Sequence, residues 1–321
     1  MNDEDKILSR AQGALLGQLA GDSLGSLVEF RRAEEIRLEY PEGVRELADG
    51  GTWNTIAGQP TDDSEMALGL ARMLVERRGY DREGARAVYV EWIDSGPFDC
   101  GNTIAQGLRG RPNEESQANG ALMRISPLGV FGAFRAIGEV AALAEEDASL
   151  THPHPVCRQA NALFAAAIAR AVKDGLSPDA LYMETIARAE ERGIDPSLME
   201  ALRGAADSPP ADYSRLQGWA LIAFQNAFWQ LLHAPDLEEG VVDTVMRGGD
   251  TDTNAAIGGA LLGAVHGREA IPAQWEKAIL SCRPRRGDPR VRHPRPERYW
   301  PADALELAER LLDAGRGEGS S

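Results

Sequence analysis

Apolar residues recur every three to four positions along most of the chain, which is the spacing of the buried face of an α-helix. Residues 5–25 carry one such row, and residues 62–77 carry a second, formed by Met66, Leu70, Met73 and Leu74. Alternating runs of β-branched residues, which would predict strands, are nearly absent. The same periodicity predicts further helices at 83–94, 137–148, 155–173, 179–192, 216–232 and 251–265.

The stretches between these helices are rich in glycine or proline, as at 40–60, 95–103 and 207–213. No repeat period emerges, and no shift in composition marks a domain boundary. The pattern therefore predicts an all-α protein: one compact domain of orthogonally packed helices over residues 1–321, in which the polar loops converge.

Composition narrows the functional classes. The chain has 321 residues and a net charge of −16, which disfavours binding to nucleic acid or to an acidic membrane and suits a protein that holds cations. Its three cysteines form no CxxC pair, so neither a disulfide framework nor a zinc knuckle is indicated. The acidic start "MNDEDKILSR" is unlike a secretory signal, and no apolar stretch is long enough to span a bilayer. We expect a soluble, cytoplasmic protein.

One segment departs from this acidic background. Residues 283–301 are rich in proline and carry seven arginines, at 283, 285, 286, 290, 292, 295 and 298. One interpretation is an extended strap packed over the acidic body. The alternative is a contact surface for a phosphate-bearing partner.

Two clusters of oxygen-bearing side chains stand at predicted helix starts. "GGDTDTN" at 248–254 and "TDDSE" at 61–65 each place two aspartates beside threonine. A helix cap explains one acidic residue at such a place, but two like charges also repel and are costly to bury. Ligands that are all hard oxygens select Mg²⁺, Mn²⁺ or Ca²⁺ over Zn²⁺. Four carboxylates favour two ions, about 3.5–4 Å apart, in a cleft at helix N-termini.

Two other motifs in the chain fail closer inspection. "DTDTN" opens like an EF-hand loop, but Ala255 stands where that loop needs glycine and Leu261 where it needs glutamate. "GDSLG" at 21–25 matches the nucleophile pattern of serine hydrolases, centred on Ser23. That pattern needs a preceding strand, whereas the segment here is predicted to be helical. Ser23 is therefore expected to serve as small helix packing.

With both acidic clusters in view, the chain resembles the ADP-ribosylglycohydrolase family. The resemblance runs in family order through "GALLGQLAGDSLGSLVEF", "TDDSEMALGL", "GPFDCGNTIAQGL", "NGALMRISPLGV", "THPHP" and "GGDTDTNAAIGGALLGAVHG". Each motif is weak alone, but all six in order are very specific. The resemblance implies an all-helical fold with two Mg²⁺ or Mn²⁺ ions in the cleft that receives ADP-ribose.

The resemblance also assigns roles to matching positions. It implies that one side of the metal pair is held by Thr61, Asp62 and Asp63, and the other by Asp250, Asp252 and Thr253. Ser64 stands where many family members have threonine, a change that keeps the hydroxyl.

The catalytic and substrate-binding positions follow in the same way. Asp99, in "FDCG", matches the acid that activates water in bacterial members, and Glu29 matches a glutamate that gates or acts as base in poly(ADP-ribose)-cleaving and serine-cleaving relatives. The diphosphate loop is matched by Ser116, Asn119 and Gly120, and a histidine facing the ribose by His152. Ala118 replaces a glycine of some relatives, which changes the shape of that loop.

The residues by themselves leave alternatives open. "ANG" at 118–120 can bind a diphosphate through backbone N–H groups or can be an ordinary turn. A single histidine such as His152 is more often structural than ligand-binding. Asp99 can carry a raised pKa suited to a base if it is buried, or can cap the helix that follows.

The resemblance implies a metal-dependent hydrolase that cleaves the C1″ glycosidic bond of ADP-ribose on a modified protein, most simply on arginine. A binding or immunity protein that neutralises an ADP-ribosyltransferase toxin is the alternative from another class. Serine-linked conjugates, small molecules and nucleic acid are the other possible carriers of ADP-ribose. In each case ADP-ribose would be the bound group or the product.

Overall fold

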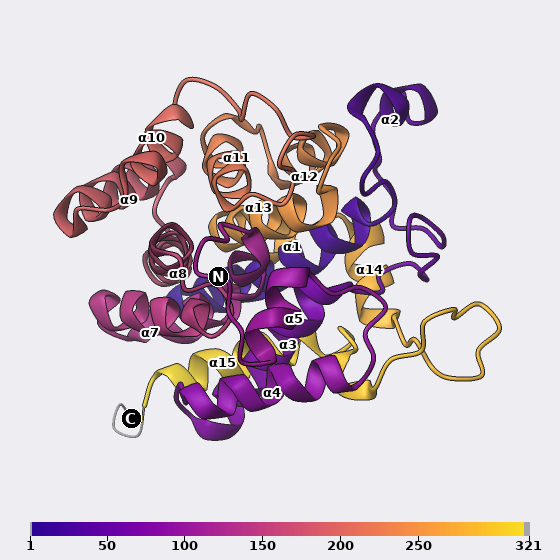
Figure 1. The fold of residues 1–321 in the computed structure, drawn as a ribbon, viewed down its shortest axis with the longest axis horizontal. Helices are drawn as coiled ribbons and strands as arrows, with labels where there is room; N and C mark the ends of the chain where they lie inside the picture. The colour runs from indigo at the N-terminus through magenta and orange to yellow at the C-terminus, as the bar shows by residue number, and fades with distance from the viewer. Residues whose placement is uncertain (1, 318–321) are drawn as a thin grey trace.

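A computed structural model describes residues 2–317 of the chain (Figure 1). In this part of the chain there are helices and three isolated β-bridges but no strand, so the prediction of an all-α fold is confirmed. The α-helices of the first half are α1 (Asp3–Gly25), α2 (Ala33–Glu39), α3 (Asp62–Arg77), α4 (Arg82–Asp94), α5 (Asn102–Leu108), α6 (Ser126–Phe131) and α7 (Ile137–Ser149). Those of the second half are α8 (Pro155–Asp174), α9 (Pro178–Arg192), α10 (Pro196–Gly204), α11 (Ala220–His233), α12 (Leu237–Met246), α13 (Thr251–His266), α14 (Ala273–Ser281) and α15 (Ala304–Gly315).

Every helix predicted from periodicity is present, and most bounds agree within two residues. The largest difference is at α11, predicted from 216 but beginning at Ala220. Leu216 adopts a left-handed conformation with φ of 58°, which a helix cannot continue through. Seven α-helices lie outside the predicted set, namely α2, α5, α6, α10, α12, α14 and α15. Most of these are short, but α15 carries a clear apolar row that the sequence already contains.

The backbones of α1 and α13 are in direct contact. A methyl group added at Gly17 would lie 2.1 Å from the carbonyl oxygen of Gly259, and one added at Gly21 would lie 2.0 Å from that of Ala255. Gly13 and Gly25 meet the same helix in the same way, so the two helices run antiparallel with a glycine at every fourth residue of α1. Only glycine permits this approach. The contact places the C-terminus of α1 beside the N-terminus of α13.

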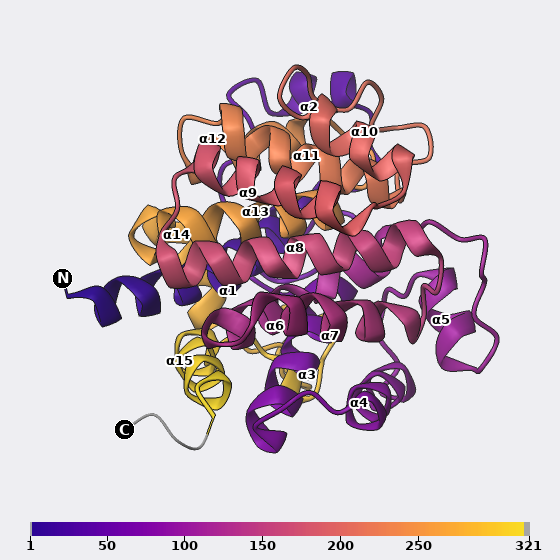
Figure 2. The same cartoon turned by 90° about the vertical axis from the view of Figure 1, so that its left-hand side faces the viewer.

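The remaining helices enclose this pair. Figure 2 shows α8 crossing the molecule between α7 and the group formed by α9, α11 and α13. On the other side α15 packs against both α1 and α3. Residues 251–264 of α13 are all buried, which explains why that helix is apolar around its circumference after the first turn.

The basic segment is irregular from residue 283 until a 3₁₀ helix, η4 (Glu297–Tyr299). Its first part projects from the body as a loop, at the right of Figure 1. The later arginines meet partners on the body: Arg295 is buried against Glu65, and Arg298 pairs with Glu91.

Ser23 lies within α1, where it is buried and its hydroxyl accepts a hydrogen bond from the amide of Gly58. No strand precedes it, so the context of a serine nucleophile is absent from this region. Within residues 2–317, no helix combines the length and the apolar character needed to cross a lipid bilayer.

Because α1 and α13 are in backbone contact, replacing glycine by alanine should have opposite effects on the free energy of unfolding at Gly17 and at Gly69. Gly17→Ala should lower the free energy of unfolding by about 1–3 kcal/mol or more, because the new methyl overlaps the α13 backbone. Gly69→Ala in α3 is the control: a methyl there meets nothing within 4 Å, and alanine favours a helix over glycine by about 0.5–1 kcal/mol. Urea unfolding of both variants measures the difference. Equal effects would contradict the contact.

Candidate active site

Three acidic stretches meet where α1 ends and where α3 and α13 begin. The first turn of α3 is held by a residue of α1: Asp22 accepts hydrogen bonds from the Thr61 amide at 3.2 Å, the Thr61 hydroxyl at 2.9 Å and the Ser64 amide at 3.1 Å. The side chain of Thr61, the residue before α3, accepts no capping hydrogen bond from the backbone of that helix. Because Asp22 provides the cap from α1, the carboxylates of Asp62 and Asp63 are not needed for that purpose.

The start of α13 is shaped by its two preceding glycines. Gly248 and Gly249 have φ of 76° and 78°, and a methyl at Gly249 would lie 2.0 Å from the carbonyl oxygen of Tyr213. The amide of Gly249 donates to the carbonyl of Arg31, and the amide of Phe30 donates to the carbonyl of Gly249. These two backbone bonds bring the residues after α1, including Glu29, beside the first residues of α13.

As a result, carboxylates from different segments converge. Single oxygens of Glu29, Asp250 and Asp252 lie within 4.8 Å of one another. Asp63 is close enough to Asp250 for their charges to interact, which brings the start of α3 beside the start of α13. The two acidic clusters, nearly 190 residues apart in the sequence, therefore form a single group of buried oxygens.

Burial and mutual repulsion raise the pKa of these acids. Burial, together with the charges of Asp99 and Asp250, raises the pKa of Glu29 to about 8. Burial is also the main cause of the raised pKa of Asp62, Asp63 and Asp252, with neighbouring carboxylates adding to it. Asp22 is raised less, to a pKa of about 6, because Ser64 and Thr61 donate hydrogen bonds to it.

The oxygen set fits divalent metal ions. One oxygen of Asp63 is buried without a hydrogen-bond partner, while the other lies 2.9 Å from the Thr61 hydroxyl oxygen. Each carboxylate in the group is close to others, and the group contains no histidine or cysteine ligand among the described residues. Such a set favours Mg²⁺ or Mn²⁺ over zinc. A bound cation would also compensate the repulsion that raises the pKa values.

A cavity of about 220 Å³ lies against this group. Eight of the twelve residues expected at the site line it: Glu29, Asp62, Asp99, Asn119, Gly120, His152, Asp250 and Thr253. The other four do not. Thr61, Asp63 and Asp252 are buried behind the lining, and Ser116 lies to one side, where its hydroxyl bonds to that of Thr103 at 2.9 Å.

Asp99 sits on the loop between α4 and α5, at the wall of the cavity. Its carboxyl group is in hydrogen-bonding contact with that of Asp62, so the two acids are directly coupled. Burial raises the pKa of Asp99, and its bonds to Asp62 and to the amide of Cys100 oppose the rise. The opposite wall residue Glu29 accepts a hydrogen bond from the indole of Trp53 at 2.5 Å.

His152 lines the cavity as a neutral ring, because burial and the nearby Arg124 lower its pKa to about 3. The guanidinium of Arg124 donates to the hydroxyl of Thr151 at 2.9 Å, and that hydroxyl lies 2.8 Å from Nδ1 of His152. We assign the Thr151 hydrogen to Nδ1, so the ring proton is on Nε2. Nε2 is buried without a partner, and it is therefore a free donor at the cavity wall.

The turn beside His152 leaves room for a ligand. A methyl added at Gly120 would lie 3.1 Å from the His152 ring and 2.9 Å from the side chain of Ile104. The neighbouring Asn119 donates its side-chain amide to Asp250 at 2.7 Å, which fixes this turn to the start of α13. A larger residue at position 120 would therefore narrow the cavity.

Comparison with known proteins gives the family. The family model described as ADP-ribosylglycohydrolase matches residues 3–320. The chain belongs to the ADP-ribosylglycohydrolase family. The ADP-ribosyl-[dinitrogen reductase] glycohydrolase of Rhodospirillum rubrum is 30% identical over 283 residues, covering 83% of this chain and 88% of the relative.

Other members extend this comparison. The ADP-ribosylarginine hydrolase Tri1 of Pseudomonas putida is 27% identical, covering 86% of this chain and 75% of its own. A solved structure described as an ADP-ribosylglycohydrolase-related protein complex superposes with a TM-score of 0.78 at 26% identity, covering 97% of this chain and 99% of that chain. The resemblance drawn from the six motifs is thereby confirmed, and the chain has the fold of its family.

Sequence reasoning missed three residues that hold the site together. Asp22 lies both in "GDSLG" and in the first family motif, and neither pattern gives it a role, yet its buried carboxylate caps α3. Arg124, within "NGALMR", donates to the carbonyl of Gly120 and pairs with Asp147 in the core. Trp53 contacts Glu29 from a glycine-rich loop, and no local pattern signals that contact.

The raised pKa values predict how the stability of the metal-free protein depends on pH. The folded protein binds more protons than the unfolded chain between the ordinary pKa of Glu29, 4.5, and its raised value of about 8. Stability should therefore be greatest at low pH in this window and fall as pH rises to about 8, by up to about 1.4 kcal/mol per pH unit for each such group.

Thermal unfolding at pH 5.5 to 8.5, after chelation and again with saturating Mg²⁺, measures this dependence. Mg²⁺ should raise the melting temperature and flatten the slope, because it competes with protons for the same carboxylates. A melting temperature that rises with pH in the metal-free protein would contradict the assignment.

Proposed function

We propose that this protein is a divalent-metal-dependent hydrolase that removes ADP-ribose from arginine side chains of modified proteins. The observation that carries the proposal is the convergence of carboxylates from four separate segments at one cavity: Glu29, Asp62 and Asp250, which are buried, and Asp99, which is half-buried. Helix capping alone does not account for this group, since Asp22 already caps α3.

The names of two relatives support the arginine assignment. One is named as a glycohydrolase of ADP-ribosylated dinitrogen reductase and the other as an ADP-ribosylarginine hydrolase. The charge of the site supports it as well, because a modified arginine keeps its positive guanidinium and would enter a cavity lined by carboxylates.

The metal ligands in this proposal are Thr61, Asp62 and Asp63 on α3, with Asp250, Asp252 and Thr253 on α13. Bound Mg²⁺ or Mn²⁺ would supply the positive charge that orients the ribose hydroxyls and increases the acidity of a bound water. Asn119 and Gly120 would hold the diphosphate, with Ser116 supporting the loop from outside the cavity. His152 would donate a hydrogen bond from its Nε2–H group to a ribose hydroxyl.

Asp99 is the proposed base. As water adds to C1″ and the C1″–N bond breaks, the water proton passes to the Asp99 carboxylate. The guanidinium carries its positive charge before cleavage, so it leaves as a neutral guanidine and then takes up a proton. The arginine linkage therefore needs no separate general acid, and the buried His152, with its pKa of about 3, is not required to act as one.

A serine linkage would place a different demand on the site. Its leaving group is an alkoxide, which needs a proton during cleavage. Glu29 is the proposed residue for that role, because it is the other acid, besides Asp99, at the cavity wall that is not among the proposed metal ligands. The two acceptors therefore give different importance to Asp99 and Glu29.

The metal requirement gives the first test of this function. ADP-ribose should be released from an arginine-linked conjugate only with Mg²⁺ or Mn²⁺, and Zn²⁺ should be a poor replacement. The assay compares arginine-, serine- and nucleotide-linked conjugates with and without each metal. Full activity after exhaustive chelation would contradict the metal assignment. Tight binding of conjugates, or of an ADP-ribosyltransferase, without any turnover would favour a binding or immunity protein.

The base assignment gives the second test. Asp99→Asn keeps the shape of the side chain but cannot accept the proton, so kcat on the arginine conjugate should fall by about 10²–10⁴-fold. Glu29→Gln should lose less on that substrate. Turnover and ADP-ribose affinity are measured for both variants at saturating Mg²⁺. If Glu29→Gln is inactive while Asp99→Asn keeps its activity, the base is wrongly assigned and the preferred acceptor moves towards serine.

A further inference from the structure

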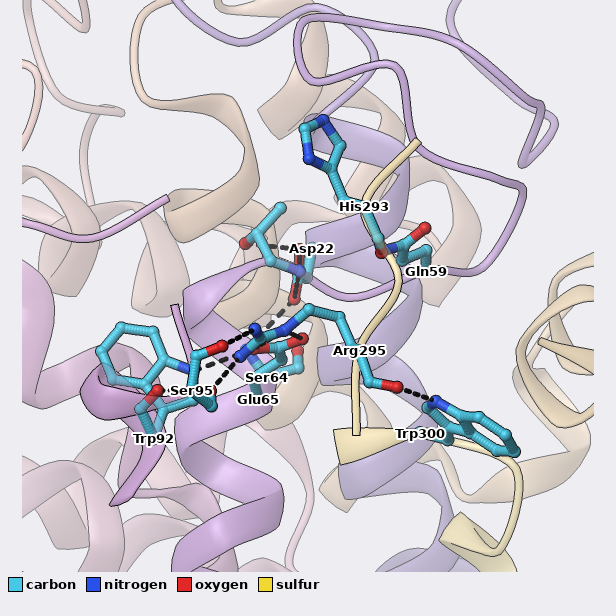
Figure 3. Close-up of polar contacts among 10 residues, drawn as sticks. Asp22, Gln59, Ser64, Glu65, Trp92, Ser95, His293, Arg295 and Trp300 are labelled. Atoms are coloured by element: carbon cyan, nitrogen blue, oxygen red, sulfur yellow. Dashed lines mark hydrogen bonds and ion pairs between the residues drawn. The ribbon is translucent and has the colours of Figure 1, made fainter. Parts of the chain in front are cut away.

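Residues 293–295 lie between the two segments that carry Asp62 and Asp99. On one side is the stretch 59–65, which leads into α3, and on the other is the stretch 92–99, which runs from the last turn of α4 to Asp99. We call residues 293–295 the bridge segment. Figure 3 shows it passing beside the first turn of α3, with the Arg295 side chain directed between Glu65 and Ser95.

Arg295 contacts both stretches through one guanidinium. Its Nε lies 2.8 Å and 3.0 Å from the two carboxylate oxygens of Glu65, and Nη2 donates to Glu65 at 2.8 Å. Nη2 also donates to the hydroxyl of Ser95 at 2.8 Å, and Nη1 donates to the Ser95 carbonyl at 3.2 Å. The indole of Trp92 adds a bond to Glu65 at 2.9 Å. Both charged side chains are buried, with 3% and 1% exposure.

His293 repeats this arrangement two residues earlier. Its carbonyl oxygen accepts a hydrogen bond from the side-chain amide of Gln59 at 2.7 Å. Its ring packs against that of Phe98 at a tilt of 33°, with ring centroids 4.6 Å apart. Arg295 contacts Glu65 and Ser95, and His293 contacts Gln59 and Phe98. Each of the two residues therefore contacts both stretches.

These contacts are close to the acids in the sequence. Glu65 is three residues after Asp62 on α3, and Phe98 directly precedes Asp99. The carboxyl groups of Asp62 and Asp99 hydrogen-bond to each other across the gap between the two stretches. The bridge segment spans the same gap from the C-terminal part of the chain.

We infer that Arg295 is a positioning residue, which together with His293 sets the placement of Asp99 relative to α3. This inference rests on the proposed function, in which Asp99 is the base. A base must lie within hydrogen-bond reach of the water that it deprotonates, and a displacement of about 1 Å can cost about 100-fold in rate.

Stability alone is a weak reason for this buried ion pair. Desolvation offsets much of the attraction between buried charges, and apolar residues of similar size often serve as well. A second arginine shows the contrast. Arg72 also joins α3 to the C-terminal part of the chain, through Asp303 at 2.7 Å, but its hydrogen bonds all go to residues 298–303. Arg295, unlike Arg72, also donates to Ser95 at the end of α4.

The test uses the double variant Ser95→Ala with His293→Ala. It removes the Ser95 hydroxyl and the ring on Phe98 but keeps the Arg295–Glu65 pair, so no buried charge is left unpaired. Hydrogen exchange of backbone amides 95–101 should increase. On the arginine conjugate kcat should fall by about 10–100-fold, whereas ADP-ribose affinity should stay within about threefold, because the ribose and diphosphate contacts come from other segments.

Two further variants separate positioning from general loosening. Arg295→Lys keeps a charge opposite Glu65 but cannot reach both partners with a planar fork, so it should show the same loss of kcat. Arg72→Met is the matched control: it detaches the C-terminal part of the chain from α3 farther from the acids. It should lower the melting temperature without changing kcat or the exchange of residues 95–101.

The outcomes distinguish this inference from the proposed function. If the double variant leaves both exchange and kcat unchanged, or if Arg72→Met lowers kcat as much, the positioning role is wrong. If exchange increases but kcat is unchanged, the bridge segment holds the loop without setting the base, and the role is again wrong. If the wild-type protein releases ADP-ribose from no conjugate, the proposed function fails, and the exchange result still shows whether the bridge segment fixes the loop.

Discussion

The direct backbone contact between α1 and α13 is the constraint on which the site depends. Glycine at every fourth residue from Gly13 to Gly25 lets the backbone of α13 come into direct contact with that of α1. No larger residue fits at Gly17 or Gly21. Because the helices are antiparallel, the last turn of α1 lies beside the first turn of α13. Asp22, Glu29 and the start of α13 then meet without a long connecting loop.

That geometry has an electrostatic cost. A group of carboxylates is held close together in a buried region, where little solvent screens their repulsion. The pKa of Glu29, raised to about 8, reflects how far burial and the neighbouring charges destabilise its ionised form. The rest of the fold must supply the stability that the site removes. The rest of α13 and the core around α8 do so, since the residues that α13 buries after Asn254 are apolar or glycine and those that α8 buries are apolar except Asn161.

Much of this could be predicted from the sequence, for identifiable reasons. Apolar periodicity located the long helices because their buried faces are continuous, and the motif order indicated the family because six short patterns rarely coincide. The glycine spacing 13, 17, 21, 25 was also readable but was not interpreted. The role of Asp22 and the Trp53–Glu29 bond could not be predicted, because each depends on the packing of segments distant in sequence. The roles of Asp99 and His152 remain predictions, although both line the cavity.

The C-terminal segment shows why a basic stretch on an acidic protein has no single meaning. Its arginines differ in environment: Arg295 is enclosed by Glu65, Trp92 and Ser95, while Arg286 is exposed on the projecting loop. A count of charges cannot separate these cases, because the distinction is whether a carboxylate from another helix is buried opposite the guanidinium. Glu65 lies in the first turn of α3, two residues after Asp63. The helix that presents acids to the cavity thus also presents an acid to the segment behind it, and the same first turn serves both contacts.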